Sequence, residues 1–140
     1  MKPKLILMSH GYLAKELLNS AEMIVGKIED AWAISMTMED GKEGLKRKLD
    51  EILATFNSDD PLLFIVDILS GTPCNLAVET MYERENTKVI TGLNLAMAIE
   101  YATEDNHNLD SLSDGLVNSS KEIIKVIEKE VINLEEDYED

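Results

Sequence analysis

Two short runs of this sequence are apolar at every position, LILM at residues 5–8 and LLFIV at residues 62–66. Strands of this kind have both faces covered, which is the situation of a central strand in a parallel sheet. We therefore expect the two runs to lie side by side in the middle of a sheet. This feature constrains the fold strongly, because it requires helices on both faces of that sheet.

The rest of the chain supplies the other strands and the helices. We predict strands at 4–8, 31–36, 62–67 and 88–91, and we place the second and fourth toward the edges because their composition is mixed. Stretches with helical spacing, such as the one around Leu45, separate the strands. Alternating strands and helices form right-handed βαβ units. The sequence thus predicts an α/β fold with a doubly wound, mainly parallel central sheet and helices on both faces.

The C-terminal part of the chain supports two interpretations. Apolar residues at helical spacing from Leu109 to Val131 predict a helix, whereas the β-branched stretch IIKVI at 123–127 is also typical of an edge strand. Acidic residues crowd the end of the chain. We expect one domain over residues 1–134, followed by an acidic tail at 135–140.

Composition excludes several classes of function. A formal net charge of −15 opposes nucleic-acid binding, which needs clustered Lys and Arg. Cys74 is the single cysteine and there are two histidines, so we expect no disulfide, no metal site and no cofactor. No apolar run has the length of a membrane span or a signal-peptide core, and we therefore expect a cytoplasmic protein that does not insert into a membrane.

The residues that follow the two central strands are the candidates for a catalytic site. In an open parallel sheet, ligands gather at the carboxyl ends of the strands, where the strand order reverses. Ser9, His10 and Gly11 follow the first run, and Asp67 follows the third. A neutral imidazole is a nucleophile near pH 7, and a carboxylate bonded to one ring N–H fixes which nitrogen carries the free lone pair. The pairing predicts His10 as the nucleophile and Asp67 as the group that orients it.

A loop and two helix starts predict an anion site beside this pair. In ILSGTPCN at 68–75, Thr72 is a good N-cap and Pro73 a good first helical residue. Free N–H groups at the helix starts can hold a phosphoryl group, and Gly11 and Gly71 let the backbone approach it. A helix N-terminus contributes only about 0.3–2 kcal/mol to a neighbouring anion. Because neither motif has a cation and there is no P-loop, the phosphoryl group should arrive already activated, from a partner protein.

For several single residues, a structural role is a simpler interpretation than a catalytic one. Thr72 is a cap more readily than a catalytic group, Cys74 and Trp32 suit packing, and His107 suits an exposed loop. A flavodoxin-like domain needs a hydroxyl-rich phosphate loop after the first strand, and a receiver-like domain needs clustered acids to hold Mg²⁺. This sequence offers neither.

Three motifs in order, MSHGYLAKELLNSAEMIVG, LFIVDILSGTPCN and VITGLNLAMAIE, resemble the IIA component of the mannose-family sugar phosphotransferase system. The resemblance covers about residues 5–100 and implies a phosphocarrier. In it, His10 takes a phosphoryl group from the phosphocarrier protein HPr and passes it to a IIB component, which works with the membrane IIC/IID complex. Asp67 matches the aspartate that hydrogen-bonds the histidine, and Gly71, Thr72 and Asn75 match the loop and helix start beside it.

The candidate phosphoryl-binding residues are Ser9, Gly11, Ser70, Gly71, Thr72 and Asn75. The family forms dimers that exchange a C-terminal strand, so the resemblance also implies a homodimer, for which the stretch 123–127 is available. Ser70 departs from a common glycine of the family and Ala96 from a common proline. Two alternatives stay open: a regulatory module that is phosphorylated but hands nothing onward, and the phosphotransfer subunit of a dihydroxyacetone kinase. The sugar is not determined by the sequence.

Overall fold

The computed structural model describes residues 1–131 of the chain. Within these residues, four parallel strands form one sheet: β1 (Lys4–His10), β2 (Ala31–Met36), β3 (Leu62–Val66) and β4 (Thr87–Thr91). Their spatial order is β2-β1-β3-β4. The chain runs outward from β1 to β2, then returns past β1 to β3 and β4. The order therefore reverses between the two central strands, as predicted.

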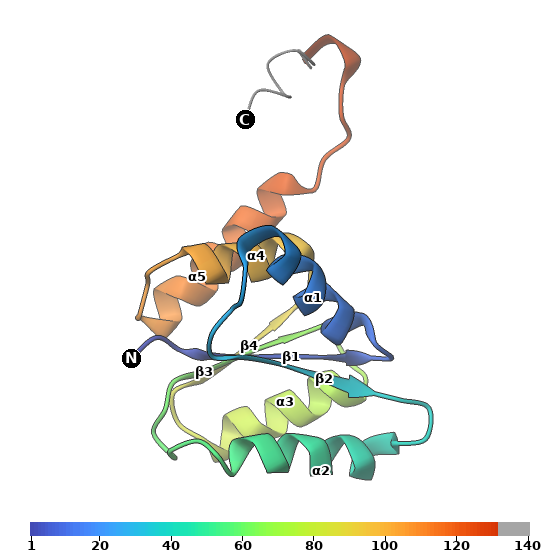
Figure 1. The fold of residues 1–140 in the computed structure, drawn as a ribbon, viewed down its shortest axis with the longest axis vertical. Helices are drawn as coiled ribbons and strands as arrows, with labels where there is room; N and C mark the ends of the chain where they lie inside the picture. Colours follow the sequence, from blue (N-terminus) through green and yellow to red (C-terminus); the bar gives the residue numbers. More distant parts are fainter. Residues whose placement is uncertain (132–140) are drawn as a thin grey trace.

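Helices cover both faces of the sheet (Figure 1). On one face lie α1 (Leu13–Val25), α4 (Leu95–Thr103) and α5 (Leu109–Ile123); on the other lie α2 (Gly41–Leu53) and α3 (Thr72–Glu83). This is the predicted doubly wound α/β architecture. Among residues 1–131, no helix has the length and apolar character needed to cross a membrane.

The two central strands divide the core between the two helical layers. Leu5 and Leu7 of β1 belong to the cluster that packs against α1, α4 and α5, while Ile6 and Met8 belong to the cluster beneath α2 and α3. The residues of β3 alternate in the same way and are all buried. Full burial of one such side chain is worth about 1.5–3 kcal/mol. Apolar residues at every position are thus explained by two covered faces.

The ends of the central strands differ slightly from the prediction. β1 continues two residues beyond the predicted 4–8 because Ser9 and His10 stay in register with Ser35 and Met36 of β2. β3 ends one residue earlier than predicted, so Asp67 is the first residue after it. His10 and Asp67 consequently emerge from neighbouring strands at the same edge of the sheet.

The C-terminal helix is shorter than its apolar spacing suggests. α5 ends at Ile123, and a single 3₁₀ turn, η1 (Lys129–Val131), follows an irregular stretch. The prediction of a helix is correct to Ile123 and wrong beyond it, and 123–127 forms no strand within the described chain. This segment leads away from the helices (Figure 1), and its apolar side chains are exposed. The predicted boundary at 134 and the tail at 135–140 lie outside the described residues.

Candidate active site

His10 and Asp67 form the centre of the candidate site. The Nδ1 atom of His10 lies 2.7 Å from Oδ2 of Asp67, and the backbone N–H of His10 donates to the same oxygen at 3.0 Å. The His10 side chain is 43 % exposed, whereas that of Asp67 is 10 % exposed. The largely buried carboxylate therefore holds the Nδ1 side of the ring, while the ring itself remains accessible from solvent.

The hydrogen bonds around Asp67 keep it ionised. Burial favours the neutral acid, but the His10 ring, the His10 N–H and the Ile68 N–H outweigh it, so the pKa of Asp67 lies below its usual value. An ionised carboxylate only accepts hydrogen bonds, so Nδ1 of His10 carries the proton that is donated to it. In the neutral ring the lone pair is then on Nε2, as nucleophilic attack requires.

The loop between β3 and α3 lies against the imidazole. A side chain at Gly71 would place its Cβ 3.1 Å from Cε1 and 3.4 Å from Nε2 of His10, so the backbone approaches the ring as closely as a glycine permits. Ser70, just before it, has a φ of +70°, a conformation that non-glycine residues rarely adopt. A glycine would adopt this φ without the steric cost that a side chain brings.

The start of α3 differs from the prediction by one residue. The N–H of Asn75 donates to the carbonyl of Gly71 at 2.9 Å, which makes Gly71 the N-cap and Thr72 the first helical residue. Thr72 thus lies one residue past the N-cap position. The assignment of Thr72 as the N-cap is therefore wrong. Asn75 is exposed on the first turn of α3.

Ser9 is placed away from the exposed face of the ring. It is fully buried, and its Oγ accepts a hydrogen bond of 2.8 Å from the N–H of Ala14. It therefore ties the start of α1 to the end of β1 and uses one of the helix's free N–H groups. Gly11 is exposed and has a φ of +57°, with no atom within 4 Å of a Cβ placed there. Of the six predicted phosphoryl-binding residues, Ser9 alone has a fully buried side chain.

The remaining candidates have structural environments. Cys74 is buried, Trp32 packs against Phe56 with ring centroids 4.8 Å apart, and His107 is exposed with Nε2 3.0 Å from Asp105. Within residues 1–131, no group of three or more His, Cys, Asp and Glu side chains is arranged to hold a metal ion.

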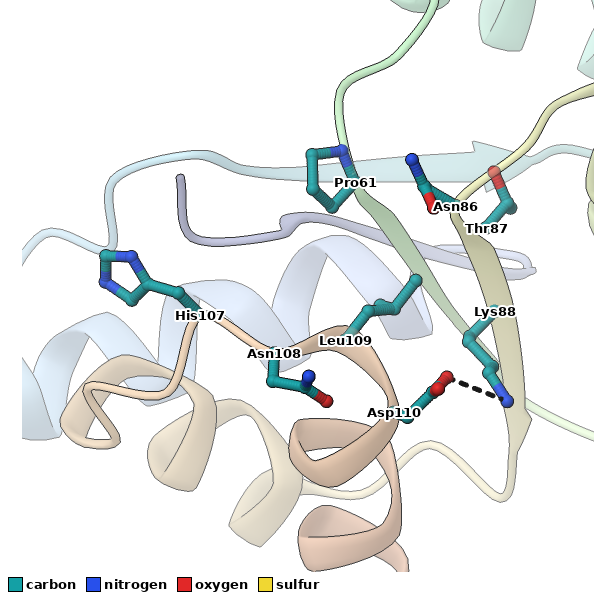
Figure 2. Close-up of a pocket in the computed structure, with 8 residues that line it drawn as sticks. All are labelled: Pro61, Asn86, Thr87, Lys88, His107, Asn108, Leu109 and Asp110. Atoms are coloured by element: carbon teal, nitrogen blue, oxygen red, sulfur yellow. Dashed lines mark ion pairs between the residues drawn. The ribbon is translucent and has the colours of Figure 1, made fainter.

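A polar cavity of about 470 Å³ lies far from His10, at the amino-terminal ends of β3 and β4 (Figure 2). It is lined in part by Asn86, His107 and Asn108, and a 3.2 Å ion pair between Lys88 and Asp110 occupies one side of it. The candidate site at the opposite edge is instead an exposed surface around the ring of His10.

The family model described as "PTS system fructose IIA component" matches residues 4–117. The chain belongs to the EIIA-man family. It is 30 % identical over 125 residues to the mannose-specific EIIAB component of Escherichia coli K12, covering 88 % of this chain and 39 % of that protein. The chain thus spans about two-fifths of the length of this curated relative. The sorbose-specific EIIA component of Lacticaseibacillus casei is 30 % identical over 138 residues, covering 96 % of this chain and 98 % of that protein.

Solved structures of EIIA proteins share the fold of this EIIA-man family member. The mannose/sorbose-specific IIA subunit from Enterococcus faecalis is 44 % identical and superposes with a TM-score of 0.88, covering 95 % of this chain and all of that one. The EIIA component from Streptococcus agalactiae is 28 % identical, with a TM-score of 0.79 over 88 % of this chain and 95 % of its own. These relatives confirm the family inferred from the three motifs.

Ile68 was not predicted from the sequence to contribute to this EIIA-man site. Its N–H donates to Oδ1 of Asp67 at 3.0 Å, while Oδ2 accepts from His10, so both carboxylate oxygens are fixed. An aspartate at a strand end often bonds a nearby backbone N–H in a turn. That tendency is the signal in the sequence from which this contact could have been anticipated.

Proposed function

We propose that this protein is a phosphocarrier that accepts a phosphoryl group on Nε2 of His10 from phospho-HPr and passes it to a IIB component. The sugar is then taken up and phosphorylated through the membrane IIC/IID complex. The single observation that carries the proposal is the 2.7 Å contact between Nδ1 of His10 and the ionised Asp67, which leaves the other ring nitrogen as the nucleophile. The same proposal places the reaction in the cytoplasm, which cell fractionation tests.

The transfer balances without a metal or a base. The Nε2 lone pair of neutral His10 attacks the phosphorus of the donor phosphohistidine in line, and the donor's N–P bond breaks with its electron pair returning to the donor ring. His10 becomes an N-phosphorylated imidazolium that keeps its Nδ1 proton. Asp67 faces that proton, so its negative charge stabilises the new cation. The reverse sequence releases the group to the IIB component.

The loop beside the ring supplies the contacts proposed for the phosphoryl oxygens. Its left-handed turn at Ser70 and Gly71 leads directly into the first turn of α3, where backbone N–H groups point out of the helix end. Thr72, the first residue of α3, adds a hydroxyl. Backbone donors of this kind stabilise an anion by about 0.3–2 kcal/mol, which positions the group without trapping it. A carrier needs that balance, because it must release what it accepts.

The proposal is tested by the intact mass of the protein after incubation with phosphoenolpyruvate, enzyme I and HPr. The wild type should gain one acid-labile phosphoryl group and His10→Ala none. The matched control is His107→Ala, which removes the other histidine and should leave the adduct unchanged. Asp67→Ala should slow the transfer without abolishing it. A phosphoryl adduct on His10→Ala would refute the assignment.

The alternatives share the first step and differ in the second. A regulatory module would be phosphorylated at His10 but would not pass the group on, and a dihydroxyacetone kinase subunit would pass it to a nucleotide-binding partner. The mannose, sorbose and fructose components among the relatives favour the carrier in sugar uptake. Loss of the adduct on addition of a purified IIB component would support it, and persistence of the adduct would favour regulation.

A homodimer is part of the proposal and rests on a different part of the chain. Ile124, Val126 and Ile127 are 74–81 % exposed and belong to a β-branched stretch that makes no strand in a single chain. In the described sheet, β2 and β4 each pair on one side only, which leaves edges that an extended segment can join. The mass of the protein by light scattering should equal two chains. Replacing the three side chains with Ser should shift that mass toward one chain.

A further inference from the structure

The residue directly before His10 is a fully buried serine. A hydroxyl in such a position costs free energy unless it makes hydrogen bonds. The Oγ of Ser9 accepts a hydrogen bond of 2.8 Å from the N–H of Ala14, and it lies 3.5 Å from the carbonyl oxygen of Gly11. The hydroxyl therefore sits inside the turn that connects β1 to α1, and this turn carries the imidazole.

The bond between Ser9 and Ala14 takes the place of an ordinary helix cap. Tyr12 occupies the N-cap position of α1 and makes no capping bond with its side chain. Ala14 is the second residue of the helix, so its N–H has no partner within the helix. An N-cap side chain usually accepts from such an N–H. Here the acceptor comes from a residue five positions earlier, so the bond ties the end of the strand to the start of the helix, across His10.

The turn fixes the backbone from which the His10 ring projects. The N–H of His10 donates to Oδ2 of Asp67 at 3.0 Å, and Nδ1 of its ring lies 2.7 Å from the same oxygen. The next N–H, that of Gly11, donates to the carbonyl of Met36 at 2.8 Å. A backbone N–H and a ring nitrogen of one residue reach one oxygen only over a narrow range of Cα positions. The geometry of the catalytic pair therefore depends on a turn that stays closed.

We propose that Ser9 is a positioning residue for phosphoryl transfer, whose hydroxyl keeps the turn closed so that the ring and N–H of His10 both reach Asp67. The inference rests on the proposed phosphocarrier function and adds a residue that acts through His10 without touching the phosphoryl group. Loss of the hydroxyl leaves the buried N–H of Ala14 without its partner. The turn then opens, the contact between Nδ1 and Oδ2 lengthens, and Nε2 carries the free lone pair less often.

The test compares Ser9→Ala with Asn108→Ala. The control removes the same kind of bond at the other end of the molecule, because Oδ1 of Asn108 accepts from the N–H of Ser111 at 2.9 Å at the start of α5. Both variants should lower the urea midpoint of unfolding. Only Ser9→Ala should transfer more slowly from phospho-HPr, with kcat lowered about tenfold and KM within about twofold of wild type. Wild-type kcat in folded Ser9→Ala would overturn the inference while leaving the carrier function intact.

Two further measurements separate positioning from a structural role. Nitrogen-15 NMR of the neutral His10 ring should show the proton on Nδ1 in the wild type and in Asn108→Ala, but a mixture of the two tautomers in Ser9→Ala. Phosphoramidate transfers its phosphoryl group directly to an imidazole nitrogen and releases ammonia, and Ser9→Ala should lose about tenfold with this small donor as well. Unchanged ring signals, or a loss confined to phospho-HPr, would overturn the inference.

A second variant, Ser9→Thr, keeps the test decisive if Ser9→Ala does not fold. It retains the hydroxyl, and hydrogen exchange of the Ala14 amide reports whether the bond to Oγ is present. If that amide stays protected, kcat should stay within about threefold of wild type; if protection is lost, kcat should fall with it. A low kcat with a protected amide, or a wild-type kcat without protection, would overturn the role of Ser9. Failure of the wild type itself to accept a phosphoryl group from phospho-HPr would overturn the carrier function as well.

Discussion

Replacement of Gly71 by alanine should separate the backbone role of this residue from its contact with the catalytic ring. Gly71 has φ 93° and ψ 166°, a region that is almost exclusive to glycine, and alanine in it costs about 1–3 kcal/mol. The new Cβ would also lie 3.1 Å from Cε1 of His10. That distance is shorter than an ordinary carbon–carbon contact, so the ring must shift by a few tenths of an ångström and its 2.7 Å bond to Asp67 must weaken.

The control for this variant is Gly26→Ala. Gly26, at the end of α1, has φ 83° and ψ −174°, and nothing lies within 4 Å of a Cβ placed there. Both variants should lose about 1–3 kcal/mol of unfolding free energy in urea titrations, for the same backbone reason. Only Gly71→Ala should also slow phosphoryl transfer, by about tenfold, because small misplacements of reacting groups are costly. Wild-type transfer by folded Gly71→Ala would refute the role of the close approach.

Three further predictions concern stability. Ser70→Gly should raise the unfolding free energy by about 0.5–1 kcal/mol in urea titrations, because relief of the positive φ outweighs the extra freedom of glycine in the unfolded chain; an unchanged midpoint would contradict it. The pKa of Asp67 is lowered by folding, so the ionised form stabilises the fold above about pH 4, and the advantage of the wild type over Asp67→Asn should be full at pH 7 and shrink as the pH falls through that lowered pKa; a constant difference in Tm would exclude this. Arg84 donates to the carbonyls of Asn57 and Asp60 at 2.5 and 3.2 Å, so Arg84→Ala should cost about 1–3 kcal/mol while phosphoryl transfer by the folded protein is unchanged.

The fold was predictable because the same apolar residues indicate both that a strand is buried and that it lies in the centre of the sheet. LILM and LLFIV are apolar throughout, and the structure covers both faces of β1 and β3. The more mixed segments AWAISM and TKVIT are the edge strands β2 and β4. The C-terminal segment was harder, because β-branched residues at helical spacing satisfy both patterns locally. α5 ends at Ile123, and the apolar side chains of Ile124, Val126 and Ile127 beyond it are exposed.

The pairing of His10 with Asp67 was predictable from topology alone, since the carboxyl ends of adjacent parallel strands meet. The buried environment of Ser9 and the position of Thr72 inside α3 were not predicted, because each depends on where an element begins or ends. Ser9 lies on the face of β1 that Leu5 and Leu7 share, which a predicted strand two residues longer would have revealed. Thr72 enters the helix because Gly71 adopts a conformation that sequence propensities do not specify.

The residues at the amino and carboxyl ends of the strands have different environments. This difference explains where prediction from the sequence succeeds. At the amino edge, Arg84 donates to two loop carbonyls, although its buried Nε has no hydrogen-bond partner within residues 1–131. At the carboxyl edge, Ser70 has an unfavourable φ, and the side chains of Met38 and Leu69 are exposed. Neither feature favours the isolated fold, and both lie at the edge where we propose that phosphoryl transfer takes place. Substitutions at either edge can therefore raise stability, but only those that alter the contacts of His10 at the carboxyl edge should change phosphoryl transfer.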